Sequence, residues 1–355
     1  MLKQYFDRFS WVDFMLKLFQ VAAIIALIVG VVNSVGAGRY SQAQWGTLVF
    51  AGLAQGSIYA LIALGYTLVY GILLMINFAH GDIYMAGAFT AVFLANSFAA
   101  SGFLASHPFW AVLALILFAA VISMALNVIV ERVAYRPLRG APRLVPLITA
   151  IGASFAIEYS FRGFYGAEFH SYPVIPALEG RNYNVVGISV PSVQIVVLIA
   201  AVALMVALYY FIEKTKIGKA MRAVSEDKEV ARLMGIDVDR TIMVTFALGG
   251  ALAGAAGVFN GLFRPQGVFF FMGFNPGIKA FTAAVLGGIG NIPGAMFGGL
   301  FLGILEAVGP NLILEGLGIP AVNQLRDAFA FSLLVIILIF RPQGIFGERL
   351  AEKKA

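Results

Sequence analysis

A few ionisable residues stand in otherwise apolar stretches of this chain and are the first candidates for chemistry. In such surroundings an unpaired charge is costly, so these residues mark proton relays, ion sites or substrate sites. A proton- or sodium-coupled carrier would use them to hold its coupling ion. Glu158 and Arg326 fall near the ends of their apolar stretches, where side chains reach water, and Glu306 alone is weak support for a proton relay. The candidates are His80, Asp82, Glu158, Glu306, Arg326 and Asp327.

Covalent chemistry has little support among these residues. A membrane hydrolase needs a nucleophile beside a base, or His and carboxylates at metal-ligand spacing. The only close pair, His80 and Asp82, is two residues apart, and on a helix such residues do not face each other. They fit a polar inner turn, NFAHGD, at residues 77–82. We therefore expect no catalytic residue and no metal site.

The sequence also lacks the motif and the residues for nucleotide and thiol chemistry. No phosphate-binding G-x-x-x-x-G-K-[ST] stretch occurs, so a separate subunit must bind nucleotide if nucleotide drives this protein. The chain has no cysteine, which excludes disulfides, thiolate nucleophiles and cysteine-ligated metals. We expect no cofactor on this chain.

Composition places these residues in a membrane protein. Of the 355 residues, 61% are hydrophobic and only 12% are charged, and the mean hydropathy is +0.90. Soluble domains carry about 25% charged residues. The net charge of +6 does not indicate nucleic acid, because Lys and Arg lie in a few loops rather than on one basic face. We expect an all-α polytopic membrane protein with about 8–10 transmembrane helices, some broken or re-entrant.

Uncharged segments long enough to cross a bilayer follow one another along the chain. We interpret residues 18–37 as a retained helix rather than a cleaved signal peptide, because the leader before it holds Asp7 and Asp13. The segment 46–76 is too long for one perpendicular span and is expected to be tilted, bent or broken. Glycines four residues apart, such as those at 52 and 56, predict close helix packing. Further spans are expected up to residue 96 and at 109–130, 144–161, 192–212, 241–263 and 322–340.

Two stretches in the C-terminal half are interrupted. Residues 264–279 are aromatic and contain Pro265 and Pro276, which predicts an external re-entrant or interfacial segment rather than a helix interior. Residues 281–305 contain Gly287-Gly288 and Pro293, which predicts two short helices that meet at a turn. Transporters place substrate at broken helices, although such breaks can also serve packing alone. Candidate pathway or gate residues are Gln55, Ser57, Asn77, His80, Asp82, Gly288 and Asn291.

The positive residues predict the topology. The N-terminus, the loops 131–143 and 213–240 and the C-terminal tail hold 18 of the 24 Lys and Arg residues. Positive residues mark cytoplasmic loops, so both termini are expected in the cytoplasm, with an even number of crossings. The other six are expected outside or near outer helix ends. They are Arg39, Arg162, Arg181, Arg264, Lys279 and Arg326.

The loop 213–240 is the longest charged run, and local chemistry predicts a short helix within it. Ser225 is a good N-cap, Glu226 and Asp227 place negative charge in the first turn, and Gly235 stands where a left-handed residue ends a helix. Val230, Leu233 and Met234 share one face of this helix. This apolar face either packs on the protein's own helices or docks on a cytoplasmic partner.

Several stretches, in order along most of the chain from Trp45, resemble the LivH-type permeases of branched-chain amino acid ABC importers. The more specific ones are NFAHGD and YRPLRGAPR. The others are GLAQGSIYALIALGYTLVYGILLMI from Gly52, the loop GKAMRAVSEDKEVARLMGIDVDR with the helix after it, GIKAFTAAVLGGIGNIPGAMFGG from Gly277, and RPQGIFG near the end.

This resemblance implies an ABC importer permease in the bacterial inner membrane that is not itself an enzyme. Its partners would be two cytoplasmic ATP-binding subunits, a second related permease subunit, an extracytoplasmic solute-binding protein delivering leucine, isoleucine or valine, and membrane lipid. The short helix would couple ATP-driven closure to the membrane domain. The implied ATPase contact comprises Glu226, Asp227, Val230, Ala231, Leu233, Met234 and Gly235.

The resemblance also suggests a division of the chain. Residues 1–44 would be an N-terminal extension with an extra transmembrane helix, 45–340 the permease domain, and 341–355 a cytoplasmic tail. Related permeases with similar motifs carry urea, short amides or other amino acids, which stay as alternative cargoes. An autonomous ion-coupled transporter is the alternative from another class.

Overall fold

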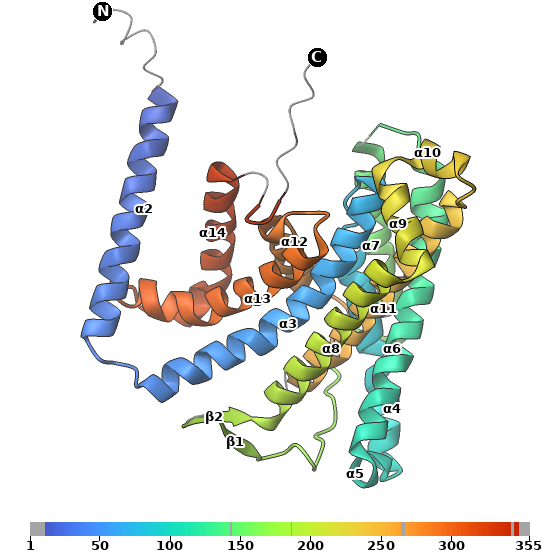
Figure 1. Ribbon diagram of the computed structural model, residues 1–355. Coiled ribbons are helices and arrows are strands. Elements are labelled where there is room, and N and C mark those ends of the chain that lie inside the picture. The colour runs from blue at the N-terminus through green and yellow to red at the C-terminus, as the bar shows by residue number, and fades with distance from the viewer. Residues whose placement is uncertain (1–10, 143, 186, 264–266, 342–343, 348–355) are drawn as a thin grey trace, which may run out of the picture.

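The computed structural model describes residues 11–142, 144–185, 187–263, 267–341 and 344–347 (Figure 1). Its helices are α2 (Trp11–Gly36), α3 (Gln42–Leu73), α4 (His80–Ala100), α5 (Phe103–Ser106), α6 (Pro108–Val130), α7 (Leu144–Tyr165), α8 (Ser192–Lys214), α9 (Lys216–Glu226), α10 (Lys228–Leu233), α11 (Val238–Phe263), α12 (Phe274–Gly287), α13 (Ile292–Gly309) and α14 (Arg326–Phe340). Shorter turns are η1 (Glu131–Tyr135) and η3 (Pro310–Leu314), which are π-helical, and η2 (Arg136–Leu138) and η4 (Val322–Leu325), which are 3₁₀. Strands β1 (Asn182–Val185) and β2 (Ile188–Pro191) form an antiparallel hairpin with Asn182 opposite Pro191.

The fold is that of a multi-pass, all-α membrane protein. Within the described ranges, nine helices are long and apolar enough to cross a membrane, in agreement with the expected number. The first turns of α2, the whole of α10 and the last turns of α14 lie at one end of the molecule, and the hairpin and α5 lie at the other (Figure 1). We call these the α10 end and the hairpin end. The N-terminal segment, the loop 213–240 and the segment that leads to the C-terminal tail are predicted to share one side of the membrane. The described parts of all three lie at or next to the α10 end.

Helix α3 is the centre of the core. Every residue from 54 to 69 is buried, and the helix packs against α8, α11, α12 and α13. It is continuous over 32 residues, so of the three alternatives expected for 46–76, tilted, bent or broken, the structure contradicts a break. At 1.5 Å per residue the helix is about 48 Å long, and it crosses the molecule obliquely (Figure 1). Tilt alone accommodates its length.

Small residues let the core helices approach each other closely, as their spacing predicted. A Cβ atom added to Gly56 of α3 would come within 2.8 Å of the Gly299 carbonyl oxygen of α13. One added to Gly257 of α11 would come within 2.7 Å of the Tyr84 carbonyl oxygen of α4. Backbones therefore pack against backbones where α3 meets α13 and where α11 meets α4.

The interrupted segment 281–305 has the predicted form, because α12 and α13 meet at a turn over residues 288–291. Gly288 has a φ of +95°, a backbone conformation that glycine adopts without a steric penalty. Pro276 lies in the first turn of α12 and not in a helix interior, and the re-entrant or interfacial character of residues 264–279 stays a prediction. A first-turn proline sacrifices no helical hydrogen bond, so the residue is tolerated there. Residues 264–266, including Pro265, lie outside the described residues.

Helix α2 stands apart from the bundle over most of its length (Figure 1). It is held near the hairpin end, where the Ser34 hydroxyl donates a hydrogen bond to the Asn311 carbonyl oxygen at 3.0 Å. The loop after it adds an ion pair of Arg39 with Glu315 at 3.2 Å and a hydrogen bond from Tyr40 to Glu315 at 2.7 Å. These contacts join the first helix to the segment after α13.

Candidate functional site

Helix α10 begins at Asp227 rather than at the predicted Ser225. The Asp227 carboxylate accepts hydrogen bonds from the backbone N–H groups of Glu229, at 2.8 Å, and Val230, at 3.0 Å. Ser225 lies inside α9 and donates its hydroxyl to the Arg222 carbonyl oxygen at 2.7 Å. Both residue types are good N-caps, so local chemistry alone could not choose between them. Glu226 is the exposed last residue of α9.

The end of α10 is fixed by Gly235, as predicted. Its φ is +83°, and the Ile236 N–H donates back to the Ala231 carbonyl oxygen at 3.1 Å. This arrangement satisfies carbonyl groups that a helix leaves free at its C-terminus. Ala231 itself is buried against the core of the chain. Helix α10 is thus a short, capped element anchored on one side.

The other side of α10 carries exposed apolar residues. Val230 is 54% exposed, Leu233 86% and Met234 77%, and we call these three side chains the apolar tip. The expectation that this face packs on the protein's own helices is wrong. Large apolar side chains grouped on a charged loop indicate a surface for a partner.

The YRPLRGAPR stretch forms an ion-pair cluster close to α10. One guanidinium N–H group of Arg139 donates a hydrogen bond to the Glu131 carboxylate, directly after α6. Another donates to the Asp239 carboxylate in the first turn of α11. We call these three residues the arginine clamp. Arg136 adds a hydrogen bond to Asp239 at 2.8 Å. Only 2% of the Glu131 side chain is exposed, against 48% of the Asp239 side chain, so the clamp joins a buried carboxylate to a surface one.

Helix α10 lies beside this clamp. Partial burial and the positive charge of Arg139 lower the pKa of Lys228, the first residue of α10. Charges interact in this way at short range, so the ammonium and guanidinium groups lie near each other. Helix α10 also contacts α11, the helix that carries Asp239. The loop after α6 and the helix with the apolar tip therefore form one charged surface.

A chain of hydrogen bonds links the two most specific motifs. The Tyr135 hydroxyl lies 3.1 Å from the Ile76 carbonyl oxygen and 3.3 Å from Asn77 Oδ1, its two acceptors. The Asn77 amide donates to Asn127 of α6 at 3.2 Å, and the Asn127 amide donates to the Phe246 carbonyl oxygen of α11 at 2.7 Å. The NFAHGD turn is thereby tied to η1, α6 and α11.

His80 and Asp82 follow this turn at the start of α4, and they have different surroundings. The His80 ring is fully buried and meets the Tyr66 ring edge-on at 4.9 Å between centroids. Asp82 is buried and accepts a hydrogen bond from Ser154 of α7. As expected, the two residues form no pair.

Glu158, one turn after Ser154, completes a buried acidic pair with Asp82. The expectation that Glu158 reaches water near a helix end is wrong, because the residue is only 2% exposed. Neither carboxyl group forms an ion pair with Lys, Arg or His in the described part of the chain. The same part of the chain holds no group of three His, Asp or Glu residues that could bind a metal ion.

The remaining pathway candidates are dispersed. Gln55 and Ser57 are buried in α3. The Ser57 hydroxyl donates a hydrogen bond within its own helix, to the Ala54 carbonyl oxygen at 2.8 Å. Asn291 caps α13 by accepting from the Gly294 N–H at 2.8 Å. The seven candidates thus fall in three places: Gln55 and Ser57 in α3, Gly288 and Asn291 in the turn before α13, and Asn77, His80 and Asp82 at the entry to α4.

Sequence reasoning missed a second ionic cluster. The Lys279 ammonium of α12 lies 2.6 Å from a Glu306 oxygen of α13 and 2.6 Å from an Asp327 oxygen of α14. The position of Lys279 outside or near an outer helix end stays a prediction; its side chain is only 4% exposed, and its partner Asp327 lies in the first turn of α14. Glu306 and Asp327 were recognised as charges in apolar stretches. Their partner could have been found only by knowing which helices are neighbours.

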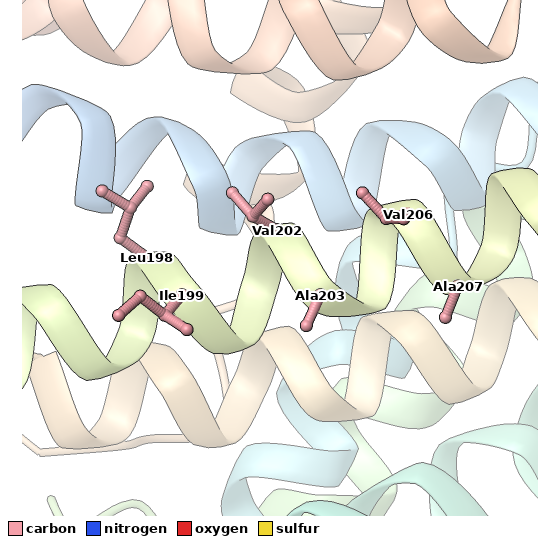
Figure 2. Close-up of a pocket in the computed structure, with 6 residues that line it drawn as sticks. All are labelled: Leu198, Ile199, Val202, Ala203, Val206 and Ala207. Atoms are coloured by element: carbon pink, nitrogen blue, oxygen red, sulfur yellow. The ribbon is translucent and has the colours of Figure 1, made fainter.

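An aliphatic groove runs along α8 beside α3 (Figure 2). Its lining residues offer no charged or hydrogen-bonding side chain, which suits contact with acyl chains and not recognition of a polar solute. They are Leu198, Ile199, Val202, Ala203, Val206 and Ala207.

Comparison with known proteins gives consistent matches. Residues 48–338 match the family described as branched-chain amino acid transport system / permease component. The high-affinity branched-chain amino acid transport system permease protein BraD of Pseudomonas aeruginosa is 43% identical over 310 residues, covering 85% of this chain and 95% of that protein. The corresponding protein LivH of Escherichia coli K12 is 41% identical, with coverages of 86% and 96%. A probable LivH of Methanocaldococcus jannaschii is 31% identical, with coverages of 82% and 89%.

Proposed function

The chain belongs to the family of permease components of branched-chain amino acid transport systems, and we propose that it is the membrane-spanning subunit of an ATP-driven importer of leucine, isoleucine and valine. The observation that carries this proposal is the apolar tip of α10. It is a rigidly capped, exposed apolar surface in a charged loop, as an element that docks on a separate ATP-binding subunit requires.

In this assembly two ATP-binding subunits bind the cytoplasmic side of the permease and of a second, related permease. A solute-binding protein delivers the amino acid on the opposite side. ATP-driven closure moves α10, and the permease pair changes from inward-facing to outward-facing. The chain supplies no catalytic group, because ATP is hydrolysed on the partner subunits. The contact comprises Glu226, Asp227, Gly235 and the apolar tip. Ala231, which the sequence also suggested for this contact, is buried and anchors α10 on the chain's own core instead.

The charge distribution supports the orientation in this proposal. The α10 end faces the cytoplasm of a bacterial cell, together with both termini, and the hairpin end faces outward across the inner membrane. Positive residues gather in the loops assigned to the cytoplasmic side. Residues 1–44 are an added segment that includes α2, residues 45–340 are the permease domain, and residues 341–355 are a cytoplasmic tail.

The solute pathway in this proposal passes the start of α4. Asn77, His80 and Asp82 are buried polar residues within the membrane domain, where such groups are costly unless they serve a site. The turn that carries them contacts η1, which lies at the α10 end of the molecule. A movement of the cytoplasmic loops therefore has a direct route to this segment.

Affinity purification from native membranes tests the assembly, with the variant Leu233→Asp as the decisive comparison. We expect the unmodified chain to retain two ATP-binding subunits and a second permease. Leu233→Asp should lose the ATP-binding subunits and lower uptake about tenfold or more, because a carboxylate would be buried unpaired in the docking site. Its level in the membrane should not change, since Leu233 is exposed in the free subunit.

Tyr183→Asp, an exposed substitution in the hairpin, is the matched control and should retain the ATP-binding subunits. A chain that purifies alone and moves solute into vesicles without ATP would contradict the proposal and favour an ion-driven carrier. Competition for uptake by urea, short amides and other amino acids distinguishes the alternative cargoes.

A further inference from the structure

We infer that Arg139 is a positioning residue, which passes the movement of α10 to α6 and the NFAHGD turn by holding Glu131 and Asp239 together. This inference rests on the proposed function, since it requires that α10 is moved by a partner. It concerns the YRPLRGAPR stretch, to which docking on the ATP-binding subunits assigns no role.

The covalent chain carries a movement of α10 in two directions only. Towards the N-terminus it reaches α9 and then α8. Towards the C-terminus it reaches α11 through residues 234–237, a tight connection in which Asp237 accepts a hydrogen bond from the Arg240 N–H at 3.0 Å. The first turn of α11, with Asp239, must follow α10 closely. Helix α6 and the turn before α4 are not next to α10 in the chain, so a movement of α10 reaches them through tertiary contacts only.

The arginine clamp adds an ionic link between these elements, beside the packing of α11 on α6 and the hydrogen bond from Asn127 to the Phe246 carbonyl oxygen. Arg139 stands on the loop after α6 and bonds both Asp239 of α11 and Glu131 at the end of α6. Glu131 is buried, so it cannot exchange this partner for water without cost. Any displacement of the α11 start is therefore transferred to the end of α6. Lys228 beside Arg139 places the same junction next to the start of α10.

From the clamp, the connection continues towards the buried polar residues at the start of α4. Glu131 opens the π-helical turn η1, and Tyr135 closes it with its hydroxyl on Ile76 and Asn77. Single π-helical turns are frequent at functional sites because they interrupt the regular ladder of a helix. Glu131 of the clamp and Tyr135 lie at the two ends of this one turn, so they move together.

Arginine suits this position better than lysine. Its planar guanidinium directs separate N–H groups to two carboxylates at fixed angles, whereas an ammonium is a flexible point charge. Arg139→Lys should keep the charge and lose the rigid link. The phenotype expected of a positioning residue is therefore uncoupling, in which the complex assembles and hydrolyses ATP but moves little solute.

The experiment uses the complete complex, with its own ATP-binding subunits and solute-binding protein, in proteoliposomes. Four variants are compared: Arg139→Lys, Arg139→Gln, Glu131→Gln/Arg139→Gln and Asp239→Asn. The double variant removes the buried carboxylate that Arg139→Gln would leave unpaired, so it protects the fold while the link stays broken. Assembly, melting temperature, ATP turnover and leucine uptake are measured for each variant.

We expect all variants that assemble to hydrolyse ATP within about twofold of the unmodified complex, while leucine uptake falls about tenfold, in the range typical of coupling between sites. A fifth variant, Arg139→Gln/Asp239→Asn, should be no worse than either change alone, because both break one link. Arg222→Gln is the matched control, since Arg222 of α9 pairs with Glu213 of α8, two helices that follow each other directly in the chain. It should leave the ratio of ATP hydrolysed to leucine moved unchanged.

An unchanged ratio of ATP to leucine in the Arg139 variants would overturn the inference. Failure of all five variants to assemble would also overturn it, by showing that the clamp serves folding alone. Failure of the proposed function is a separate result, because the unmodified chain would then carry no ATP-binding subunits or show no ATP-dependent uptake.

Discussion

Two ionic clusters in the described part of this protein have the same arrangement of charges and different positions. In each, one basic residue holds two carboxylates from different elements: Arg139 with Glu131 and Asp239, and Lys279 with Glu306 and Asp327. The Arg139 side chain is 21% exposed and lies next to α10, whereas the Lys279 side chain is 4% exposed and joins α12, α13 and α14.

We interpret the arginine clamp as a link between elements that move, and the lysine cluster as a link that stabilises the fold. Each cluster has one carboxylate in the core and one that is about half exposed, Asp239 at 48% and Asp327 at 45%. The difference lies in the basic residue: Arg139 stands partly exposed on a loop, whereas Lys279 is buried between helices and also lies 5.7 Å from the centre of the Tyr59 ring. We expect loss of the first to affect coupling and loss of the second to affect folding.

Lys279→Met is the change with the largest expected effect. It leaves Glu306 buried without a partner, and breaking a buried ion pair by removing one member costs about 3–5 kcal/mol. Folded protein in detergent extracts should fall severely, as measured by size-exclusion chromatography of a fluorescent fusion. Asp327 matters less, since its side chain is 45% exposed and reaches water.

The double variant Lys279→Met/Glu306→Gln is the control for this explanation. Removing the unpaired carboxylate should restore part of the folded fraction, because no buried charge then remains in α13. If the double variant were no better than Lys279→Met, loss of packing rather than of charge pairing would explain the effect. A normal folded fraction in Lys279→Met would remove the contrast between the clusters.

Arg136→Gln is the change with the smallest expected effect, and it tests whether position within a cluster matters. Arg136 also bonds Asp239, but its side chain is 52% exposed and it reaches no buried carboxylate. Exposed ion pairs contribute about 0–1 kcal/mol. Leucine uptake and melting temperature should stay within about twofold and a few degrees of the unmodified protein. A loss as large as that of Arg139→Gln would show that Asp239 alone, not the bridge to α6, is the essential partner.

Much of this arrangement could be predicted from local sequence. Uncharged stretches predicted the membrane spans, glycine spacing predicted the close helix–helix contacts, and Gly235 predicted the end of α10. Each of these features depends on residues close together in the sequence. The start of α10 was misplaced, since Ser225 and Asp227 are equally good caps. The sequence could not choose between a tilted, a bent and a broken α3, because Gly52 and Gly56 serve contacts with α13 rather than a break.

The two ionic clusters required knowledge of tertiary structure. Arg139 and Asp239 are 100 residues apart, and Lys279 and Asp327 are 48 apart. No periodicity in the sequence relates such pairs. The motif that contains Arg139 was recognised as specific, but its role depends on the side-by-side placement of α6 and α11, which hydropathy does not specify.

The most direct measurement of the central claim is site-specific cross-linking at the apolar tip. The chain contains no cysteine, so Leu233→Cys introduces its only thiol. A short thiol-to-amine cross-linker should join this position to an ATP-binding subunit in the assembled complex, while Tyr183→Cys in the hairpin should give no such product. Equal absence of the product from both variants, in a complex that still transports leucine, would contradict the docking of α10 on an ATP-binding partner.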